Sequence, residues 1–138
     1  MHSGLAAGAA ADLPSALAAM KNGGAVASSR SRLARPTIVF HGDSDATVHP
    51  GNGEHVLSAS IGLAGGKPEL ESGQTADGRG YTRQIHRTAE GQVLAEHWLV
   101  HGADHAWSGG SRQGSYTDPA GPDATGQMVR FFLQHPKD

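Results

Sequence analysis

The stretch that most constrains the fold is the apolar run from Thr37 to Phe40, which reads Thr-Ile-Val-Phe between Pro36 and Gly42. β-Branched and aromatic side chains favour extended backbone, and proline and glycine commonly bound a strand. Unbroken apolar character, without alternation, is typical of a strand that is buried on both faces, as in a parallel sheet. The run therefore predicts a central, buried strand in a layered α/β domain.

Helical and strand patterns alternate around this strand. The segment 12–24 begins with a capping aspartate and a proline and ends in two glycines, which predicts a short helix. Apolar residues at helical spacing predict a second helix over 51–66 and a third over 123–136. Two strands joined by a turn around Ala89–Gly91 are expected within 78–102. The order helix, strand, helix, hairpin, helix indicates the α/β class.

Some finer features of these elements are also predicted. The first strand of the hairpin alternates with polar neighbours and is expected at a sheet edge; its alternating residues are Tyr81, Arg83, Ile85 and Arg87. The last helix is expected to bury one apolar face, made of Met128, Val129, Phe132 and Leu133. Between them, residues 102–121 form a long loop rich in Gly, Ser, Pro and Asp, and loops of this length are often functional.

Size and composition exclude several classes of function. The 138 residues suit one domain, and 11 Lys and Arg against 13 Asp and Glu leave no basic face for nucleic acid. No apolar stretch approaches the roughly 20 residues that span a bilayer, so no membrane partner is expected. The chain has no cysteine, which excludes disulfides, thiol nucleophiles and thiolate metal sites.

Candidate catalytic residues follow two of the expected strands. Asp43 and Asp45 come after the buried run, and Asp104 and His105 come after the second strand of the hairpin. In open α/β sheets, reactive groups gather beyond the carboxyl ends of strands. An acid followed by a histidine is the order of the α/β-hydrolase triad, in which a carboxylate orients the imidazole that takes a proton from a nucleophilic serine. The pattern therefore predicts an acid–base pair between these two loops.

Three stretches carry a resemblance to a known family. They read RPTIVFHGDSDATVHPGNG, HGADHAWSGGS and GSYTDPAGPDATGQMVRFFLQHP, and together they resemble the C-terminal half of the poly(3-hydroxybutyrate) depolymerase-like esterases. The opening HSGLAAGAAADLPSALAAM resembles the stretch that follows the nucleophile region in that family. The resemblance implies that residues 1–138 are the C-terminal part of an α/β-hydrolase domain, with its last parallel strands, an edge hairpin and flanking helices.

The resemblance also implies an activity and the residues that perform it. Asp45 matches the family's catalytic acid, His105 matches its catalytic base, and Trp107 resembles a residue near the acyl or polymer cleft. The implied reaction is hydrolysis of a carboxylic ester through an acyl-enzyme on serine, without a cofactor. The implied substrate is a polyester or a small ester. Localisation is not indicated by the residues, and secretion is implied only by analogy with relatives.

One part of the expected machinery is absent from the sequence. The family's nucleophile occupies a G-x-S-x-G turn, and no such pentapeptide occurs among the 138 residues. We therefore expect the nucleophile half of the domain to lie upstream of Met1 and this chain to be inactive alone. A central strand without its upstream neighbours would expose an edge, which predicts self-association. The alternative is a non-catalytic binding or structural remnant whose acid and histidine are idle.

Other interpretations of the same residues stay open. Asp45 could simply cap the next helix, and Asp43 is expected to hold a turn. His41 is expected to be packed or hydrogen-bonded, whereas His49 could line the cleft. Two aromatic residues of the long loop could be loop anchors or substrate platforms, namely Trp107 and Tyr116. A zinc site is not expected, because neither H-E-x-x-H nor a carboxylate set accompanies the recurring histidines His97, His101 and His105.

Overall fold

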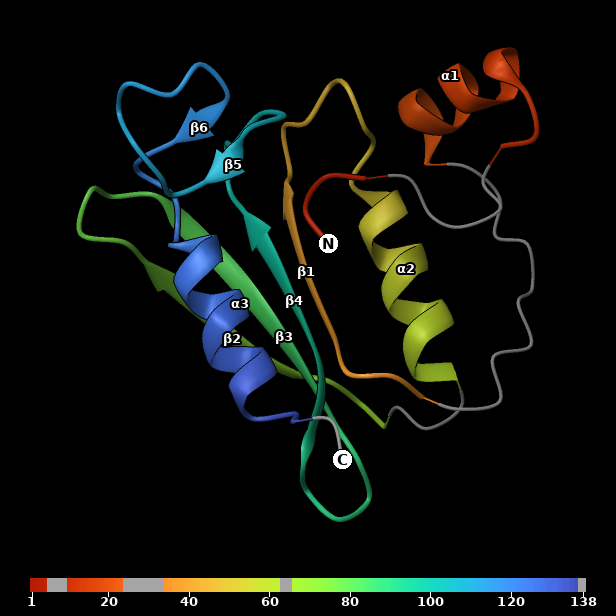
Figure 1. The fold of residues 1–138 in the computed structure, drawn as a ribbon, viewed down its shortest axis with the longest axis vertical. Coiled ribbons are helices and arrows are strands. Elements are labelled where there is room, and N and C mark those ends of the chain that lie inside the picture. Colours follow the sequence, from red (N-terminus) through yellow and green to blue (C-terminus); the bar gives the residue numbers. More distant parts are fainter. Residues whose placement is uncertain (5–9, 24–33, 63–65, 137–138) are drawn as a thin grey trace.

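The computed structural model describes residues 1–4, 10–23, 34–62 and 66–136. Within these ranges the helices are α1 Leu13–Asn22, α2 Gly51–Ile61 and α3 Ala124–Leu133. The main sheet comprises β1 Thr37–Gly42, β2 Glu69–Gln74, β3 Gly80–Arg87 and β4 Val93–Val100, and a separate short pair comprises β5 Trp107–Ser108 and β6 Thr117–Asp118. The four-stranded sheet has the order β1-β4-β3-β2 and is mixed, with helices packed on it (Figure 1). The α/β class predicted from the sequence is confirmed.

The predicted apolar strand forms as β1. It pairs in parallel with β4, and Phe40 lies beside Trp98 in the register. Ile38 and Phe40 pack in a core with residues of α3. The alternate residues Val39 and His41 face α2, because both lie close to Gly53 of that helix. β1 is thus covered on both faces, which is why its apolar run is unbroken.

β1 lies at one end of the described sheet, whereas the sequence predicted a central strand. Its outer edge is partly covered by the first residues of the chain, where a parallel bridge joins His2 to Phe40. The amide of Phe40 donates to the carbonyl of Met1 at 2.8 Å, and the amide of Ser3 donates to the carbonyl of Phe40 at 3.0 Å. Within the described ranges, these bonds and the helices keep β1 buried without a second full strand beside it.

Three antiparallel strands take the place of the predicted hairpin. β3 pairs with both β2 and β4, so the prediction that β3 is an edge strand is wrong, and β2 forms the edge. β2 was not predicted because Glu69–Gln74 contains no β-branched or aromatic residue and is mostly exposed. Ion pairs of 3.0 Å attach it to β3, from Arg83 to Glu71 and from Arg87 to Glu69.

The inward face of α3 is rotated from the predicted one. Ala124 and Phe131 are buried, and Met128 packs partly buried against the same core. The other residues predicted to point inward are exposed, namely Val129, Phe132 and Leu133. Apolar side chains occur on neighbouring faces of this helix, so their spacing alone does not select one. The observed orientation of α3 places Arg130 toward the sheet, where its guanidinium donates to both oxygens of the buried Glu96 carboxylate at 2.7 and 2.9 Å.

Capping residues set the ends of the other two helices. Asp12 caps α1 in a reciprocal capping box, and Gly23 ends it with φ +79°, as the sequence predicted. α2 ends at Ile61, earlier than predicted, because Gly62 turns the chain with φ +52°. Residues 63–65 of the predicted helix lie outside the described residues. No helix in the described ranges is long and apolar enough to cross a membrane.

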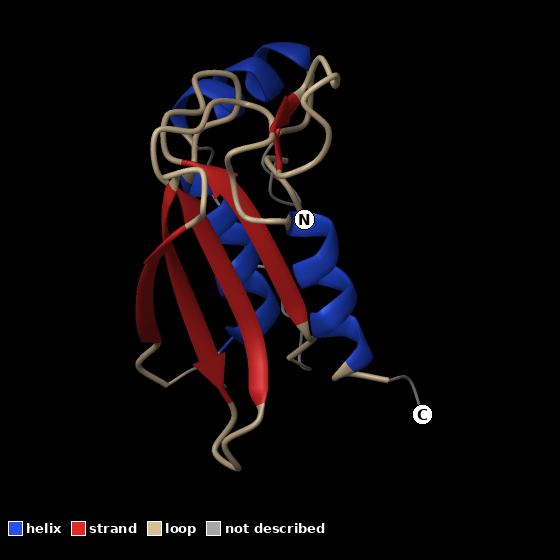
Figure 2. Cartoon of the chain, turned by 90° about the vertical axis from the view of Figure 1, so that its left-hand side faces the viewer, coloured by secondary structure: helices blue, strands red, loops and turns tan. Residues whose placement is uncertain are grey.

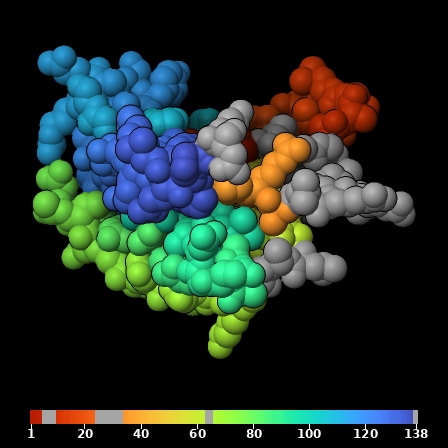
Figure 3. All heavy atoms as spheres, turned by 60° about the horizontal axis from the view of Figure 1, so that its bottom comes forward, coloured from red at the N-terminus to blue at the C-terminus, as the bar shows by residue number. Residues whose placement is uncertain are grey.

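The loops gather at one end of the sheet. The loops after β1 and β4, the pair β5–β6 and α1 lie at the end where the two parallel strands terminate (Figure 2). The predicted loop 102–121 is therefore partly organised by β5 and β6. At the opposite end, the turn between β3 and β4 lies beside α3 (Figure 3).

Candidate active site

The loops after β1 and β4 are in backbone contact. The amide of Asp43 donates to the carbonyl of Val100 at 3.0 Å, and the amide of Ser44 donates to the carbonyl of Ala103 at 3.1 Å. A Cβ at Gly42 would lie only 2.1 Å from that carbonyl oxygen of Ala103, so the approach requires glycine. The loops that follow β1 and β4 therefore lie side by side at the carboxyl ends of these two parallel strands.

Asp45 from the first loop and His105 from the second meet in a direct hydrogen bond. Oδ2 of Asp45 and Nδ1 of His105 are 2.9 Å apart, although 60 positions separate them in sequence. The Asp45 side chain is fully buried, and its Oδ1 accepts from the amides of Thr47 at 2.9 Å and Val48 at 2.7 Å. It does not cap α2, whose N-cap is Pro50, so the helix-capping interpretation is wrong. The structure brings the expected acid and base together.

The surroundings of Asp45 keep its carboxylate ionised. Burial raises the pKa of Asp45, but hydrogen bonds from the Val48 amide, the His105 ring and the Thr47 amide outweigh it, and the pKa lies below its ordinary value. An ionised acid holds the imidazole proton at Nδ1 and leaves Nε2 as the proton acceptor. The His105 side chain is 39% exposed and lines a pocket.

His41 supports the acid from the buried side. Its Nε2 lies 2.7 Å from the carbonyl oxygen of Val48 and 3.3 Å from Oδ2 of Asp45. Burial lowers the pKa of His41, so its ring is neutral and donates its Nε2 proton. It is the packed, hydrogen-bonded residue that the sequence predicted. His49 is exposed, accepts the Gly51 amide at 3.1 Å and does not line the pocket beside His105.

A second acid–histidine pair lies in the same loops. Oδ2 of Asp43 is 2.9 Å from Nδ1 of His101, and its Oδ1 accepts the amide of Gly102 at 2.7 Å. Nε2 of His101 is 2.9 Å from the hydroxyl of Thr82, so both ring nitrogens have partners. The sequence predicted that Asp43 holds its own turn through nearby amides. Its role is structural, but its side chain connects the two loops instead, through His101 and the Gly102 amide.

The histidines considered for zinc do not converge. The side chain of His97, in β4, is buried against α2. His101 contacts Asp43, and His105 contacts Asp45. Across the described parts of the chain, no group of three or more His, Asp or Glu side chains could hold a metal ion.

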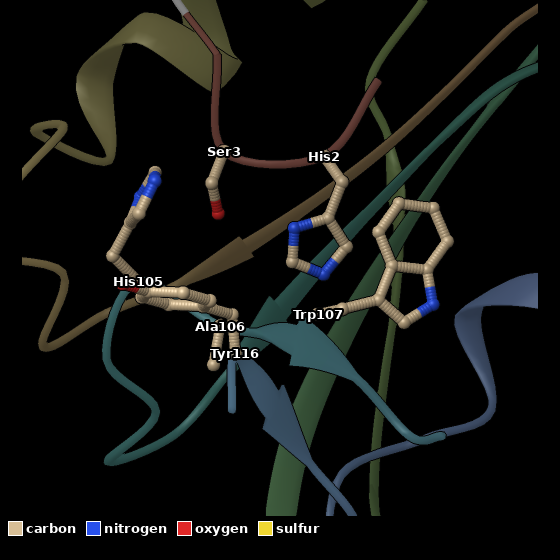
Figure 4. A pocket seen from close by; sticks show the side chains of 6 residues that line it. All are labelled: His2, Ser3, His105, Ala106, Trp107 and Tyr116. Carbon is tan, nitrogen blue, oxygen red and sulfur yellow. The ribbon is translucent and has the colours of Figure 1, made fainter. Parts of the chain in front are cut away.

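A pocket of about 320 Å³ opens beside His105 (Figure 4). Its lining consists of His2, Ser3, His105, Ala106, Trp107 and Tyr116. This lining contains aromatic rings and no Lys, Arg, Asp or Glu side chain. Its size and its uncharged lining suit a small uncharged molecule or one unit of a longer chain.

Trp107 forms one wall of this pocket. Its indole stacks on the ring of His2 with centroids 4.8 Å apart, and its Nε1 donates to the hydroxyl of Thr125 at 3.2 Å. Trp107 is 38% exposed, so an anchored ring still presents a face to the pocket. Tyr116 lies in the same lining and is more exposed.

Two lining residues, His2 and Ser3, were not predicted as site residues. They reach the pocket because the parallel bridge to Phe40 carries the start of the chain past the end of β1. No spacing pattern links them to His105. The one available signal was the resemblance of the opening HSG stretch to the segment after the family's nucleophile.

No family model matches the chain, and comparison with curated proteins found no match.

Proposed function

We propose that this chain supplies the acid and base of a serine carboxylic ester hydrolase of the poly(3-hydroxybutyrate) depolymerase type. The observation that carries the proposal is the 2.9 Å bond between the fully buried Asp45 carboxylate and His105, at the rim of an uncharged pocket. The acid and the base follow two adjacent parallel strands, β1 and β4. This supports an assignment of the sheet as the C-terminal part of an α/β-hydrolase domain.

In this proposal His105 moves the proton and Asp45 holds the ring. Nε2 of His105 takes the proton of the attacking serine hydroxyl while Nδ1–H stays bonded to Oδ2 of Asp45. The serine oxygen bonds to the ester carbon, and Nε2 then gives its proton to the departing alcohol oxygen. A water molecule attacks the acyl-enzyme in the same way, which releases the acid and returns the proton to serine.

The attacking serine is proposed to lie outside the 138 residues. The sequence contains no G-x-S-x-G turn. Ser108, close to His105 in sequence, donates its hydroxyl to the carbonyl of Pro122 at 2.7 Å. Ser3 lines the pocket, but its hydroxyl has no hydrogen bond to His105 in the structure.

The pocket lining supports an uncharged acyl chain as the bound group. Trp107 and Tyr116 offer aromatic surface to methyl and methylene groups. The lining has no cation to bind a free carboxylate, and the ionised Asp45 nearby would repel one. A polyester unit and a short acyl ester share the favoured chemistry.

The test compares hydrolysis of p-nitrophenyl butyrate by this chain and by a protein extended upstream with the serine turn of its own reading frame. We expect no activity above the His105→Ala variant for the chain alone, and about a 10³-fold gain or more for the extended protein. His105→Ala should abolish that gain, whereas a control substitution at exposed His49, His49→Ala, should preserve it.

Two results would contradict the proposal. Activity in the chain alone that His105→Ala removes would place the nucleophile within these residues. A reading frame without an upstream G-x-S-x-G turn, together with an inactive chain, would favour the non-catalytic alternative.

A further inference from the structure

Ser3 has a strained backbone. Its φ is +42°, and among the described residues it is the only one other than glycine with a positive φ. Such a conformation costs free energy for a residue with a Cβ, and it persists where surrounding contacts enforce it. Here its amide donates to the carbonyl of Phe40 at 3.0 Å, and neighbouring bonds to β1 hold the segment.

The hydroxyl of Ser3 is buried without a partner. The residue is 8% exposed, and no hydrogen bond to its Oγ forms in the structure. A buried polar group without a partner is costly, so it calls for an explanation. Figure 4 shows the Ser3 side chain turned toward the same space as His2 and His105, which places the unpaired hydroxyl at a pocket.

His2 places a second donor at the same pocket. Its Nε2 is 2.9 Å from the amide of Ser108, and because an amide can only donate, Nε2 accepts. Burial is the main cause that lowers the pKa of His2 to about 4, so the ring is neutral and its proton is on Nδ1. Stacking between Phe40 and Trp107 holds the ring, and Figure 4 shows its other nitrogen on the side of Ser3 and His105.

We propose that Ser3 Oγ and His2 Nδ1 are paired hydrogen-bond donors that hold a carbonyl oxygen of an uncharged ester in the pocket beside His105. This inference rests on the proposed esterase function, and it names two residues that select the ligand. Both donors are neutral, and the ionised Asp45 lies behind His105, so a carbonyl oxygen fits better than a carboxylate.

The experiment measures binding by this chain without turnover. Methyl butyrate is titrated into the protein while the indole N–H signal of Trp107 is followed by NMR, and 1-methoxybutane, an ether of similar length that lacks the carbonyl, is titrated in parallel. We expect Ser3→Ala to weaken binding of the ester about 3- to 10-fold and to leave binding of the ether unchanged. The control is Ser58→Ala, on the exposed side of α2, which should change neither.

The melting temperature of Ser3→Ala separates a ligand-binding hydroxyl from one that only stabilises the fold. Because the native hydroxyl has no hydrogen-bond partner, we expect Ser3→Ala to keep or raise the melting temperature. No binding of the ester by the native chain, equal affinity in the variant, equal loss for ester and ether, or a clear fall in melting temperature would each overturn the inference. If Ser3→Ala does not fold, Ser3→Gly removes the same hydroxyl and tolerates the positive φ.

The two proposals fail separately. The esterase proposal fails through absent hydrolysis in the extended protein. The proposal of a donor pair would be contradicted by the binding measurements, and binding requires no nucleophile.

Discussion

Gly42 and Ala103 lie in backbone contact where β1 and β4 end. A Cβ on Gly42 would lie 2.1 Å from the carbonyl oxygen of Ala103 and 2.8 Å from that of Asp104. Gly42 ends β1 directly before the loop that carries Asp45, and Ala103 lies in the loop that carries His105. The geometry of the acid–base pair therefore depends on an approach that only glycine permits.

Gly42→Ala should weaken the fold and disturb this pair. Because backbone atoms must move to admit the methyl group, we expect a loss of roughly 1–3 kcal/mol in the free energy of unfolding. Urea unfolding measures it. The control is Gly66→Ala, where a Cβ meets nothing within 4 Å and little change is expected. Equal effects at both positions would contradict the role of the contact.

Asp45→Asn should remove the proton-holding partner of His105. In a catalytically complete protein, we expect kcat to fall by on the order of 10³- to 10⁴-fold, because an amide does not stabilise the imidazolium. In the chain alone, the low-field Nδ1 proton signal of His105 should disappear. The matched variant Asp43→Asn alters the neighbouring pair and should preserve that signal. Its persistence in Asp45→Asn would refute the pairing.

Glu96→Gln should destabilise the contact between the sheet and α3. The buried Glu96 carboxylate accepts from Arg83 and Arg130, both at 2.7 Å at the shortest contact. Removing its charge leaves Arg130 without an acidic partner and Arg83 with only the exposed Glu71, which should cost roughly 3 kcal/mol. The control Asp77→Asn breaks an exposed 3.5 Å pair with Arg112 and should cost almost nothing. Thermal and urea unfolding of both variants provide the comparison.

The buried histidines should make the fold sensitive to acid. Burial lowers the pKa of His97 to about 4 and also lowers the pKa values of His41 and His86. Unfolded imidazoles titrate near pH 6.5, so as the pH falls the unfolded state binds protons first. Stability should be full above about pH 6.5 and then decline by up to about 1.4 kcal/mol per pH unit for each ring.

The contribution of His97 can be isolated. We expect His97→Met to reduce the slope of unfolding free energy against pH between about pH 6.5 and about pH 4.5, whereas His49→Gln, at an exposed position, should not. Urea unfolding at a series of pH values gives the slope. An unchanged slope in His97→Met would show that the ring is not protonated differently in the two states.

Self-association is expected through the outer edge of β1. In the part of the chain that the structure describes, the first residues cover this edge only in part, and unpaired strand edges pair with other chains. Light scattering after size-exclusion chromatography should show species larger than a monomer that grow with concentration. Thr37→Lys places a charge at the half-buried start of β1 and should reduce them, whereas Ser58→Lys on α2 should not. A monomer at all concentrations would contradict this prediction.

The sequence by itself determined the elements whose signals are local. Thr37–Phe40 form a buried strand because four neighbouring side chains favour extended backbone, and Asp12 and Gly23 bound α1 because capping involves adjacent backbone groups. The placement of Asp45 and His105 after strands followed from the same local reasoning. The order of an acid and a histidine after two strands predicted an acid–base pair, and the resemblance implied that Asp45 and His105 form it. Their catalytic roles stay a proposal.

Only the tertiary structure decided the features that depend on distant partners. β3 is internal because β2 pairs with it in an antiparallel ladder that side-chain ion pairs reinforce, and α3 is rotated so that Arg130 reaches Glu96. Ser3 joins the pocket of His105 because the start of the chain bonds to β1. In each case the local sequence is compatible with more than one arrangement of the strand, the helix or the start of the chain. The contacts that determine the arrangement form between residues far apart in the chain, so residue spacing along the sequence does not predict them.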